Sequence, residues 1–498
     1  LLAGNFIGIG FNEDVAWTHT VSTAARFTLF ELELNPDDPM QYRFGEEYRD
    51  IEAVPVDVPA DDAATSRRHT VYLTHFGPVI ASAGLPWTAA KAYAVRDAIV
   101  DNNTTVSTYF ALQTARNVAD VEAAISRQGT FFVNTIAADR DGNAFYGDLS
   151  ATPNLDAATI LRCRRAVDGI PARVLILDGA DPSCDWQVDD RSAVPGNMPP
   201  GDMPRATSTG YFTNSNDSYW LSNPENRLEG YSPVIGDEGT PRSLRTRAGL
   251  TFVGEAIADG AKLTPDDVQG MLFSHRHFGA EVFLDDVLAL CAESGDDVAA
   301  SCEVLAEWDR RTDTDSRGAH IWREFWDQAM RIPGLHAVGF DLADPIHTPR
   351  GLNLDDAEVS KALVAALAGA QKKVGDAGMA LDARWGDVQF AARNGERIGI
   401  PGGIGHHGVF SYIVSGFTEG QGYTPIIHGN SYIQVVGWDE DGRLDARGIL
   451  TYSQSPEPDS PHYADQTKLY SEGGWIDFPF TEDEIRADPN LEVVTLRE

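Results

Sequence analysis

The chain has 498 residues, of which 75 are acidic and 39 are basic, and its formal net charge at pH 7 is −36. A charge of this sign and size argues against a nucleic-acid partner and against anionic membranes. The acidic residues are spread along the chain, so we interpret them as a heavily solvated surface. No apolar run reaches the roughly 18 residues of a membrane-spanning helix, and no membrane span is predicted.

The four cysteines form two sequence-local pairs, Cys163 with Cys184 and Cys291 with Cys302. No C-x-x-C motif or histidine spacing completes a zinc site, so two disulfides are favoured over four reduced, buried thiols. Disulfides predict a periplasmic or secreted protein. The chain opens on Leu1 without an initiator Met or a signal peptide, which indicates processing or truncation upstream.

The first 150 residues alternate strand-like runs with turns. The predicted strands are two short ones around Asn12–Asp14 and others at 27–34, 70–74, 78–80, 105–110 and 130–136. A helix is predicted near 118–126, a tight turn at Gly77-Pro78 and a hairpin at Asp141-Gly142. Residues 151–210 are rich in Pro, Gly and Asp, and they are predicted to be a surface excursion.

The second half of the chain begins with a helix-rich segment. In the sequence Thr264-Pro265-Asp266-Asp267, a threonine N-cap precedes a proline at the first helical position and an acid at the third. Helices are predicted at 268–273, 282–292, 297–307, 319–330 and 355–374. Strands are predicted to return at 385–388, 408–414, 432–438 and 448–452.

The common hydrolase motifs are absent from the sequence. Neither Ser415 nor Ser431 lies in a G-x-S-x-G motif, and no H-E-x-x-H motif is present. His275 and His277 are spaced by two on a predicted helix, so they point to different sides and are interpreted as solvated or structural. An α/β-hydrolase and a zinc peptidase are therefore not indicated.

Five separated motifs carry a resemblance to a known family. They are GFNEDVAWTHTVST at 10–23, THFGPVI at 74–80, AADRDGNAFYGD at 137–148, NSND at 214–217 and SPHYADQ at 460–466. In this order they resemble the β-subunit of the penicillin acylase family, in particular its acyl-homoserine-lactone and aculeacin-type acylases. The resemblance implies an α+β fold, the αββα sandwich of the N-terminal-nucleophile hydrolases. It also implies one domain over 1–498, incomplete at its N-terminus, with a helical insertion at 265–378.

The resemblance implies amide hydrolysis by an N-terminal serine, whose own α-amine acts as the base. It assigns the backbone N–H of Val21 and the side-chain amide of Asn216 as the donors that stabilise the tetrahedral intermediate. Without the resemblance, Val21 would be interpreted as a core-strand valine and Asn216 as a turn residue. Arg242 is chosen as the supporting arginine, and Arg245 and Arg247 are the alternatives.

The nucleophile itself is not in this sequence. Residue 1 is Leu, which has no hydroxyl or thiol, and the resemblance implies that the serine and the α-subunit lie upstream. His19 is expected to hydrogen-bond within its sheet. His462 and Asp465 are expected to organise the carboxy-terminal part of the fold.

No metal and no cofactor are predicted. The family often holds a structural calcium ion, but the positions after Val21, residues 22–25, contain no carboxylate. The segment Asp313–Gly318 is similar to a calcium loop, but Arg317 places a cation where that loop needs an oxygen ligand. We interpret the segment as an ordinary turn between helices.

The predicted function is hydrolysis of the amide bond in N-acylated small molecules, acyl-homoserine lactones or other long-chain acyl amides. One alternative is a β-lactam side-chain acylase. Another is a non-catalytic relative that binds acylated ligands, if Leu1 is the mature terminus. The expected partners are the N-acyl substrate and an α-subunit from the same precursor.

Overall fold

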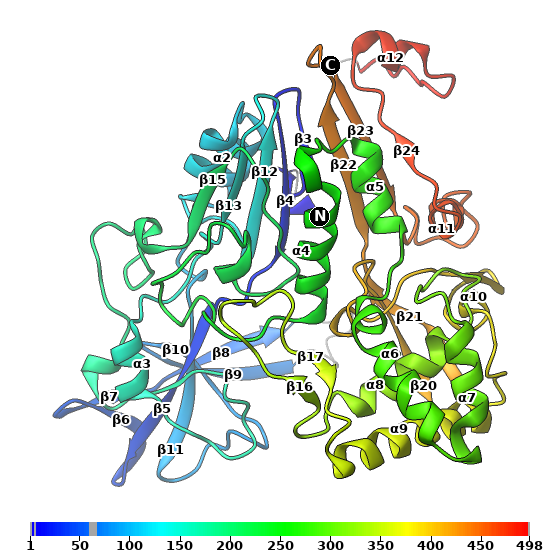
Figure 1. Cartoon of the computed structure of the whole chain (residues 1–498). Coiled ribbons are helices and arrows are strands. Elements are labelled where there is room, and N and C mark those ends of the chain that lie inside the picture. The colour runs from blue at the N-terminus through cyan, green and yellow to red at the C-terminus, as the bar shows by residue number, and fades with distance from the viewer. Residues whose placement is uncertain (1, 4–5, 59–66, 497–498) are drawn as a thin grey trace. The chain divides into compact units, whose positions relative to one another are not determined.

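The computed structural model describes residues 2–3, 6–58 and 67–496. The chain divides into two compact units, Leu1–Glu238 and Gly239–Glu498, and each contains both helices and strands (Figure 1). The predicted α+β class is confirmed. Among the described residues, no helix has both the length and the apolar character needed to cross a membrane.

One sheet of the first unit has five antiparallel strands in the order β15-β13-β12-β4-β3. The strands are β3 (Gly10–Phe11), β4 (Val15–Val21), β12 (Val133–Asp139), β13 (Ala144–Gly147) and β15 (Arg205–Ser208). The predicted hairpin at Asp141-Gly142 joins β12 to β13, and Gly142 has a φ of 86° there. This φ lies in the region that glycine enters without steric cost.

Two helices, α1 (Thr105–Gln113) and α2 (Val118–Ile125), accompany this sheet, and α2 contacts β12 and β13. The prediction of α2 is confirmed, whereas the strand predicted at 105–110 is wrong because these residues form α1. The run is rich in β-branched and aromatic residues, which favour a strand locally. Its buried residues Thr108 and Leu112 are four apart, however, so tertiary packing selects a helix.

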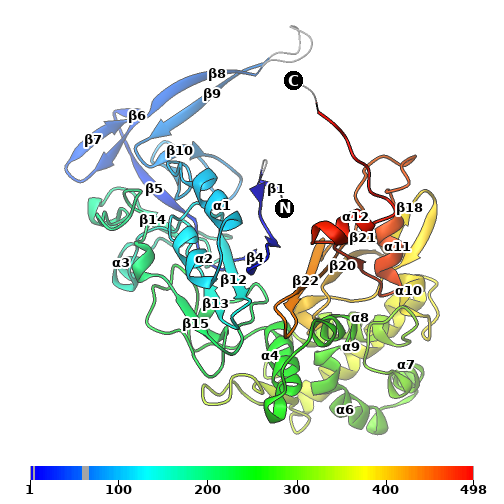
Figure 2. The same ribbon diagram turned by 90° about the horizontal axis from the view of Figure 1, so that it is seen from above.

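The second sheet of this unit has the order β7-β6-β5-β11-β10-β9-β8, and β14 pairs in parallel with β5. The strands are β5 (Phe27–Asn35), β6 (Asp38–Phe44), β7 (Glu47–Asp50), β8 (Glu52–Val58), β9 (Arg67–Thr74), β10 (Gly77–Ile80), β11 (Lys91–Asp97) and β14 (Ile176–Asp178). Figure 2 shows β8 and β9 as a long two-stranded ribbon. The turn predicted at Gly77-Pro78 is instead at residues 75–76, and both predicted turn residues belong to β10.

The segment 151–210 is more buried than the predicted surface excursion. It contributes β14 and the helix α3 (Ala157–Cys163), and Trp186 is buried and donates its indole N–H to Thr28 Oγ1 at 2.9 Å. Both predicted disulfides are confirmed, Cys163–Cys184 here and Cys291–Cys302 in the second unit. The first disulfide lies in the same apolar core as β5.

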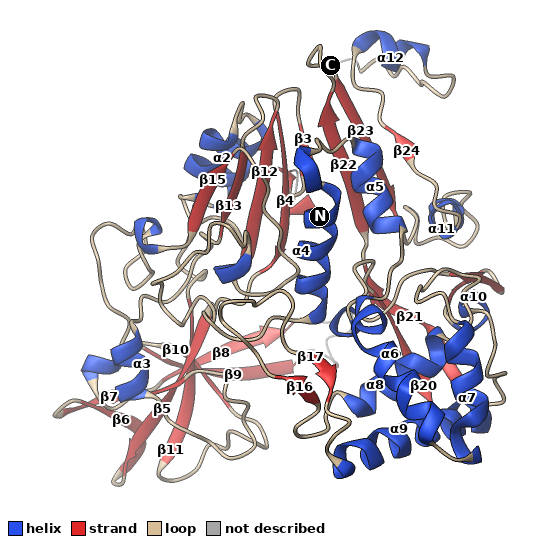
Figure 3. Cartoon of the chain, in the orientation of Figure 1, coloured by secondary structure: helices blue, strands red, loops and turns tan. Residues whose placement is uncertain are grey.

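The second unit contains a group of helices and several small sheets (Figure 3). The helices are α4 (Leu244–Ala256), α5 (Pro265–Phe273), α6 (Phe278–Glu293), α7 (Asp296–Glu307), α8 (Ala319–Ala329), α9 (Ala357–Asp376), α10 (Trp385–Val388), α11 (Asp465–Ser471) and α12 (Glu482–Ala487). Thr264 caps α5 in a capping box with Asp267, so the predicted helix start is confirmed. The strand predicted at 385–388 is wrong, because this segment forms α10.

The strands of the second unit pair mostly as hairpins. They are β16 (His336–Val338), β17 (Arg350–Leu352), β18 (Phe390–Arg393), β19 (Glu396–Gly399), β20 (Ile413–Thr418), β21 (Gly422–Gly429), β22 (Tyr432–Trp438), β23 (Leu444–Leu450) and β24 (Ile476–Asp477). β22 begins and ends as predicted.

The first unit also has the short pair β1 (Leu2–Ala3) and β2 (Phe6–Ile7).

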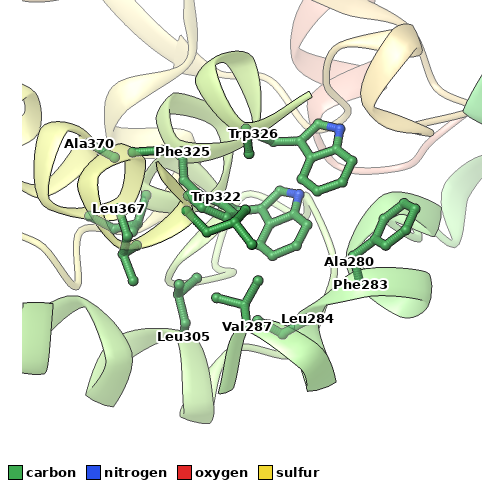
Figure 4. Packing of buried hydrophobic residues seen from close by; sticks show 14 of the residues in the cluster. Ala280, Phe283, Leu284, Val287, Leu305, Trp322, Phe325, Trp326, Leu367 and Ala370 are labelled. Carbon is green, nitrogen blue, oxygen red and sulfur yellow. The ribbon is translucent and has the colours of Figure 1, made fainter. Parts of the chain in front are cut away.

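The core of the helical group surrounds α8, whose side chains pack against α6, α7 and α9 (Figure 4). Trp322 and Trp326 stack with their ring centroids 5.4 Å apart and an interplanar angle of 8°. Trp326 also stacks on Phe283 of α6, with a centroid distance of 4.7 Å. Two indoles one helical turn apart therefore fix α8 among its neighbours.

We expect Trp326→Ala to lower the free energy of unfolding by about 3–5 kcal/mol, because it removes a large side chain that is only 2% exposed. Urea unfolding followed by circular dichroism at 222 nm measures this loss. The control is Met330→Ala at the end of the same helix, where the residue is 40% exposed and the loss should be much smaller. Equal losses in the two variants would contradict the role given to the tryptophan stack.

Candidate active site

Val21 is the last residue of β4 and lies four residues beyond Trp17, where the described pairing of β4 with β3 ends. The next residue, Ser22, donates its backbone N–H to the carbonyl of Phe132 at 2.9 Å. In an antiparallel pair, only every second residue of a strand directs its N–H to the partner strand. Because Ser22 does so, the N–H of the preceding residue, Val21, points away from β12. The Val21 side chain is 51% exposed, which differs from a core-strand valine.

Asn216 lies beside Val21 although 195 residues separate them in sequence. Its Nδ2 donates to the carbonyl oxygen of Val21 at 3.2 Å. Asn216 is exposed and has a φ of 58°, in the left-handed region that asparagine tolerates better than most residues. The structure thus brings together the two residues that were predicted to bind the oxyanion.

Asn214 holds Asn216 in this position. Its Oδ1 accepts the backbone N–H of Asn216 at 2.9 Å and the hydroxyl of Thr20, on β4, also at 2.9 Å. Its Nδ2 donates to the carbonyl of Asp217 at 2.9 Å. The Asn214 side chain therefore stabilises the turn that contains Asn216 and also connects this turn to β4, the strand that ends at Val21.

A buried asparagine on β12 completes the support. Asn134 is 1% exposed and donates its Nδ2 to Asn214 Oδ1 at 3.2 Å and to the Val21 carbonyl at 3.3 Å. Tyr146 donates its hydroxyl to Asn134 Oδ1 at 2.6 Å, and burial raises the pKa of that hydroxyl well above its usual value. Sequence reasoning missed Asn134, Asn214 and Tyr146. The signal for Asn134 was a polar residue inside an apolar strand, which must find buried partners.

A buried carboxyl group supports the residue after Val21. Ser22 donates its hydroxyl to Asp148 Oδ2 at 2.5 Å, and the same hydroxyl accepts the backbone N–H of Ala24 at 2.9 Å. Asp148 is 0% exposed, and its removal from water raises its pKa to about 7, an effect that the hydrogen bond from Ser22 opposes. This carboxyl thus titrates near neutral pH directly behind the candidate site.

The three candidate arginines belong to the second unit, and each contacts other residues of that unit. Arg242 donates its Nε to the carbonyl of Thr240 at 3.0 Å. Arg245 places its guanidinium over the ring of Tyr412, 5.2 Å from the centroid. Arg247 is 2% exposed and donates to a backbone carbonyl at 2.6 Å, and burial lowers its pKa to about 10. All three arginines thus contact residues of their own unit, and the choice of Arg242 over Arg245 and Arg247 stays a prediction.

His19 contacts Thr135 on the neighbouring strand, with 3.1 Å between Nδ1 and Oγ1, and burial lowers its pKa to about 4. The prediction of a hydrogen bond within the sheet is confirmed. His462 and Asp465 are exposed and contact each other where α11 begins, with 2.8 Å between Nδ1 and Oδ2.

His275 and His277 lie before α6, so the prediction that they belong to a helix is wrong. Both are buried, at 4% and 2% exposure, which agrees with the structural alternative and not with the solvated one. His277 caps α6 by accepting the backbone N–H of Ala280 at 3.1 Å, and His275 contacts Ser411 Oγ at 2.9 Å. A predicted helix could not reveal either role, since the chain turns sharply at His275, where φ is 45°.

Comparison with known proteins identifies the family. The model of the penicillin amidase family matches residues 2–487. The chain belongs to this family.

Curated penicillin amidase relatives match nearly the whole chain. Acyl-homoserine lactone acylase PvdQ of Pseudomonas syringae pv. syringae is 36% identical over 502 residues, which cover 99% of this chain and 64% of the relative. Aculeacin-A acylase of Actinoplanes utahensis is 38% identical over 517 residues, with the same two coverages. The chain therefore spans less than two thirds of the length of these relatives.

The solved structure of a penicillin G acylase is similar in fold to this chain. The thermostable penicillin G acylase of Alcaligenes faecalis superposes with a TM-score of 0.64 at 17% identity, covering 100% of this chain and 90% of that one. This match places the chain in the N-terminal-nucleophile hydrolase fold.

Asp148 generates a prediction on pH dependence. Its pKa is about 7 in the folded protein and near 3.8 when unfolded, so the unfolded state loses its proton first as the pH rises. The contribution of this group to stability is complete below pH 3.8, decreases as the pH rises and levels off above pH 7. Three pKa units correspond to roughly 4 kcal/mol. Asp148→Asn should remove this decrease, measured as Tm between pH 5 and pH 8.

Asp141→Asn in the exposed β12–β13 turn is the matched control, and it should keep the pH profile of the unmodified protein. A profile for Asp148→Asn that still falls in parallel with the unmodified protein would contradict this assignment.

Proposed function

We propose that this chain is the major part of an acylase that hydrolyses the amide bond of N-acylated small molecules. The observation that carries the proposal is the Asn216 amide nitrogen, held 3.2 Å from the carbonyl oxygen of Val21, the last residue of β4. The names of the relatives support acyl-homoserine lactones or other long-chain acyl amides as substrates. A β-lactam side-chain acylase is the second candidate.

The nucleophile in this proposal is a serine upstream of Leu1, exposed by autoproteolysis of a precursor that also supplies an α-subunit. The hydroxyl of the serine attacks the substrate carbonyl carbon, and its own α-amine takes the proton. The carbonyl oxygen becomes an oxyanion, which accepts hydrogen bonds from the Val21 N–H and from Asn216 Nδ2. The amine then returns the proton to the leaving nitrogen, and water hydrolyses the acyl-enzyme.

The geometry suits an oxyanion hole because its donors are neutral and already positioned. A backbone N–H and an asparagine amide donate hydrogen bonds without titrating, so their contribution does not depend on pH. The amide nitrogen of Asn216 carries two hydrogens, and such a group can contact Val21 and a substrate oxygen together. The network through Asn214 and Asn134 reduces the reorganisation needed when charge develops.

We also propose three finer features of the family for this chain. They are the four-layered αββα sandwich as one domain over 1–498, the helical insertion at 265–378 and Arg242 as the supporting arginine. A periplasmic or secreted location is also proposed, and the two disulfides support it because such bonds persist in oxidising compartments.

The test of the function uses the complete reading frame from which this chain derives. The purified protein is incubated with N-acyl-homoserine lactones of increasing acyl length and with penicillin G, and the released amines are quantified by mass spectrometry. We expect release of homoserine lactone, most rapidly from long acyl chains. Faster release of 6-aminopenicillanic acid would favour the β-lactam candidate. Binding of acylated ligands without any release would contradict the acylase proposal.

Asn216→Ala in the same full-length protein should lower kcat by about 10²–10³, the usual cost of removing one oxyanion-hole donor. KM should change little, because the interaction strengthens only as the oxyanion forms. The rate of amine release under saturating substrate gives kcat.

Asn226→Ala is the matched control, since Asn226 is also an exposed asparagine of the same loop region and should leave kcat unchanged. Normal turnover by Asn216→Ala, in protein shown by mass spectrometry to be processed, would exclude Asn216 from the oxyanion hole.

A further inference from the structure

Three potential metal ligands converge in the second unit, within its own fold. They are Asp327 of α8 and the adjacent residues His406 and His407 of a short 3₁₀ helix, η5 (Gly405–His407). Each side chain offers one donor atom, and the three donor atoms all lie within 4.8 Å of one another. His407 Nε2 is 2.8 Å and His406 Nε2 is 3.5 Å from Asp327 Oδ1.

These distances are close to those of a metal centre. Zinc binds histidine nitrogen and carboxylate oxygen at roughly 2.0–2.2 Å, so in a tetrahedral site neighbouring donors lie about 3.4 Å apart. The rings of His406 and His407 are 4.6 Å apart at 88°, so the two imidazoles approach from different directions. Small side-chain rotations would therefore bring the three donor atoms within reach of one ion.

The fold holds two of the three ligands firmly. Asp327 follows the buried Trp326 on α8 and has a side-chain exposure of 33%, and His407 is 1% exposed. Gly408 ends η5 with a φ of 92°, and a Cβ there would meet the backbone nitrogen of Gly279 at 2.8 Å. The backbone of η5 thus packs directly on the start of α6, and only glycine fits at this position.

We propose that Asp327, His406 and His407 form a binding site for a divalent transition metal of the zinc type, which joins η5 to α8. Two imidazoles and one carboxylate are ligands that Zn²⁺ accepts, and a fourth position would be open to water. His406 is half exposed and provides an entry path for the ion, with a side-chain exposure of 53%.

Two other histidine–carboxylate contacts of the same unit show why this group differs. His347 with Asp344 and His462 with Asp465 are single exposed pairs at 2.6 and 2.8 Å. Among the described residues, only the Asp327 group gathers three ligands. A single surface pair contributes little to stability and needs no ion, whereas a third, buried ligand makes chelation possible.

One nearby charge opposes metal binding. Arg323 lies one helical turn before Asp327, and its positive charge acts on both Asp327 and His407. Its guanidinium is anchored on Ser415, by Nη1 to Oγ at 2.9 Å and by Nη2 to the carbonyl at 2.7 Å. The anchored cation should limit the affinity without blocking the site.

The experiment uses the intact protein, freed of metal with a chelator and then titrated with Co²⁺ and Zn²⁺. We expect visible absorption bands of four-coordinate Co²⁺ at one ion per chain, the loss of these bands when Zn²⁺ displaces Co²⁺, and a rise in Tm with Zn²⁺. His406→Ala, at the exposed ligand, should weaken Zn²⁺ binding by at least about tenfold. Asp327→Asn is the second variant and should do the same.

His462→Ala is the matched control, because it removes an exposed histidine with a carboxylate partner but leaves the three ligands intact. Its Zn²⁺ affinity and Co²⁺ spectrum should equal those of the unmodified protein. The proposal is overturned if the unmodified protein shows no such bands, or if His406→Ala and Asp327→Asn bind Zn²⁺ as the control does. Neither readout depends on acylase activity, so this result and that of the substrate test are independent.

Discussion

The register between β4 and β12 is the constraint on which the candidate site depends. The two strands pair from Val15 opposite Asp139 to Val21 opposite Val133, and the buried side chains of Val15 and Trp17 fix this alignment. A slip of one residue would turn every side chain of β4 to the other face of the sheet. The slip would also exchange the residues of β4 whose N–H groups bond to β12 with those whose N–H groups point away from it. The N–H of Val21 would then point toward β12.

The polar side chains around the end of β4 hold the turn at Asn216 in a fixed position. An exposed turn in the left-handed region would ordinarily be mobile, but Asn214 connects the backbone of Asn216 to Thr20, and Asn134 adds a second contact from β12. The position of Asn216 beside Val21 is therefore set by the fold itself. Asp148 extends the same principle, since it binds the hydroxyl of the residue that follows Val21.

Sequence reasoning succeeded where the local signal and the packing agree. The capping residues at Thr264 and the Asp141-Gly142 hairpin are decided by a few neighbouring residues, and the structure has both. It failed at 105–110 and 385–388, where segments predicted as strands form the helices α1 and α10. In the second case Trp385 donates its indole N–H to the carbonyl of Gly402 at 2.8 Å. A bond to a residue 17 positions away is decided by tertiary structure, which local propensity does not contain.

The residues proposed to have functional roles show even more clearly that sequence neighbours alone do not reveal tertiary contacts. No local pattern links Val21 to Asn216, so their pairing could be proposed from family resemblance and not from propensity or periodicity. The same is true of Asp327 and His407, which are 80 residues apart, because a search for metal-ligand spacing within one segment passes over both. A signal did exist in the residue types themselves. Asn134 in an apolar strand and His407 beside glycines are polar groups that a folded chain must satisfy, and asking which partners satisfy them leads directly to the two sites.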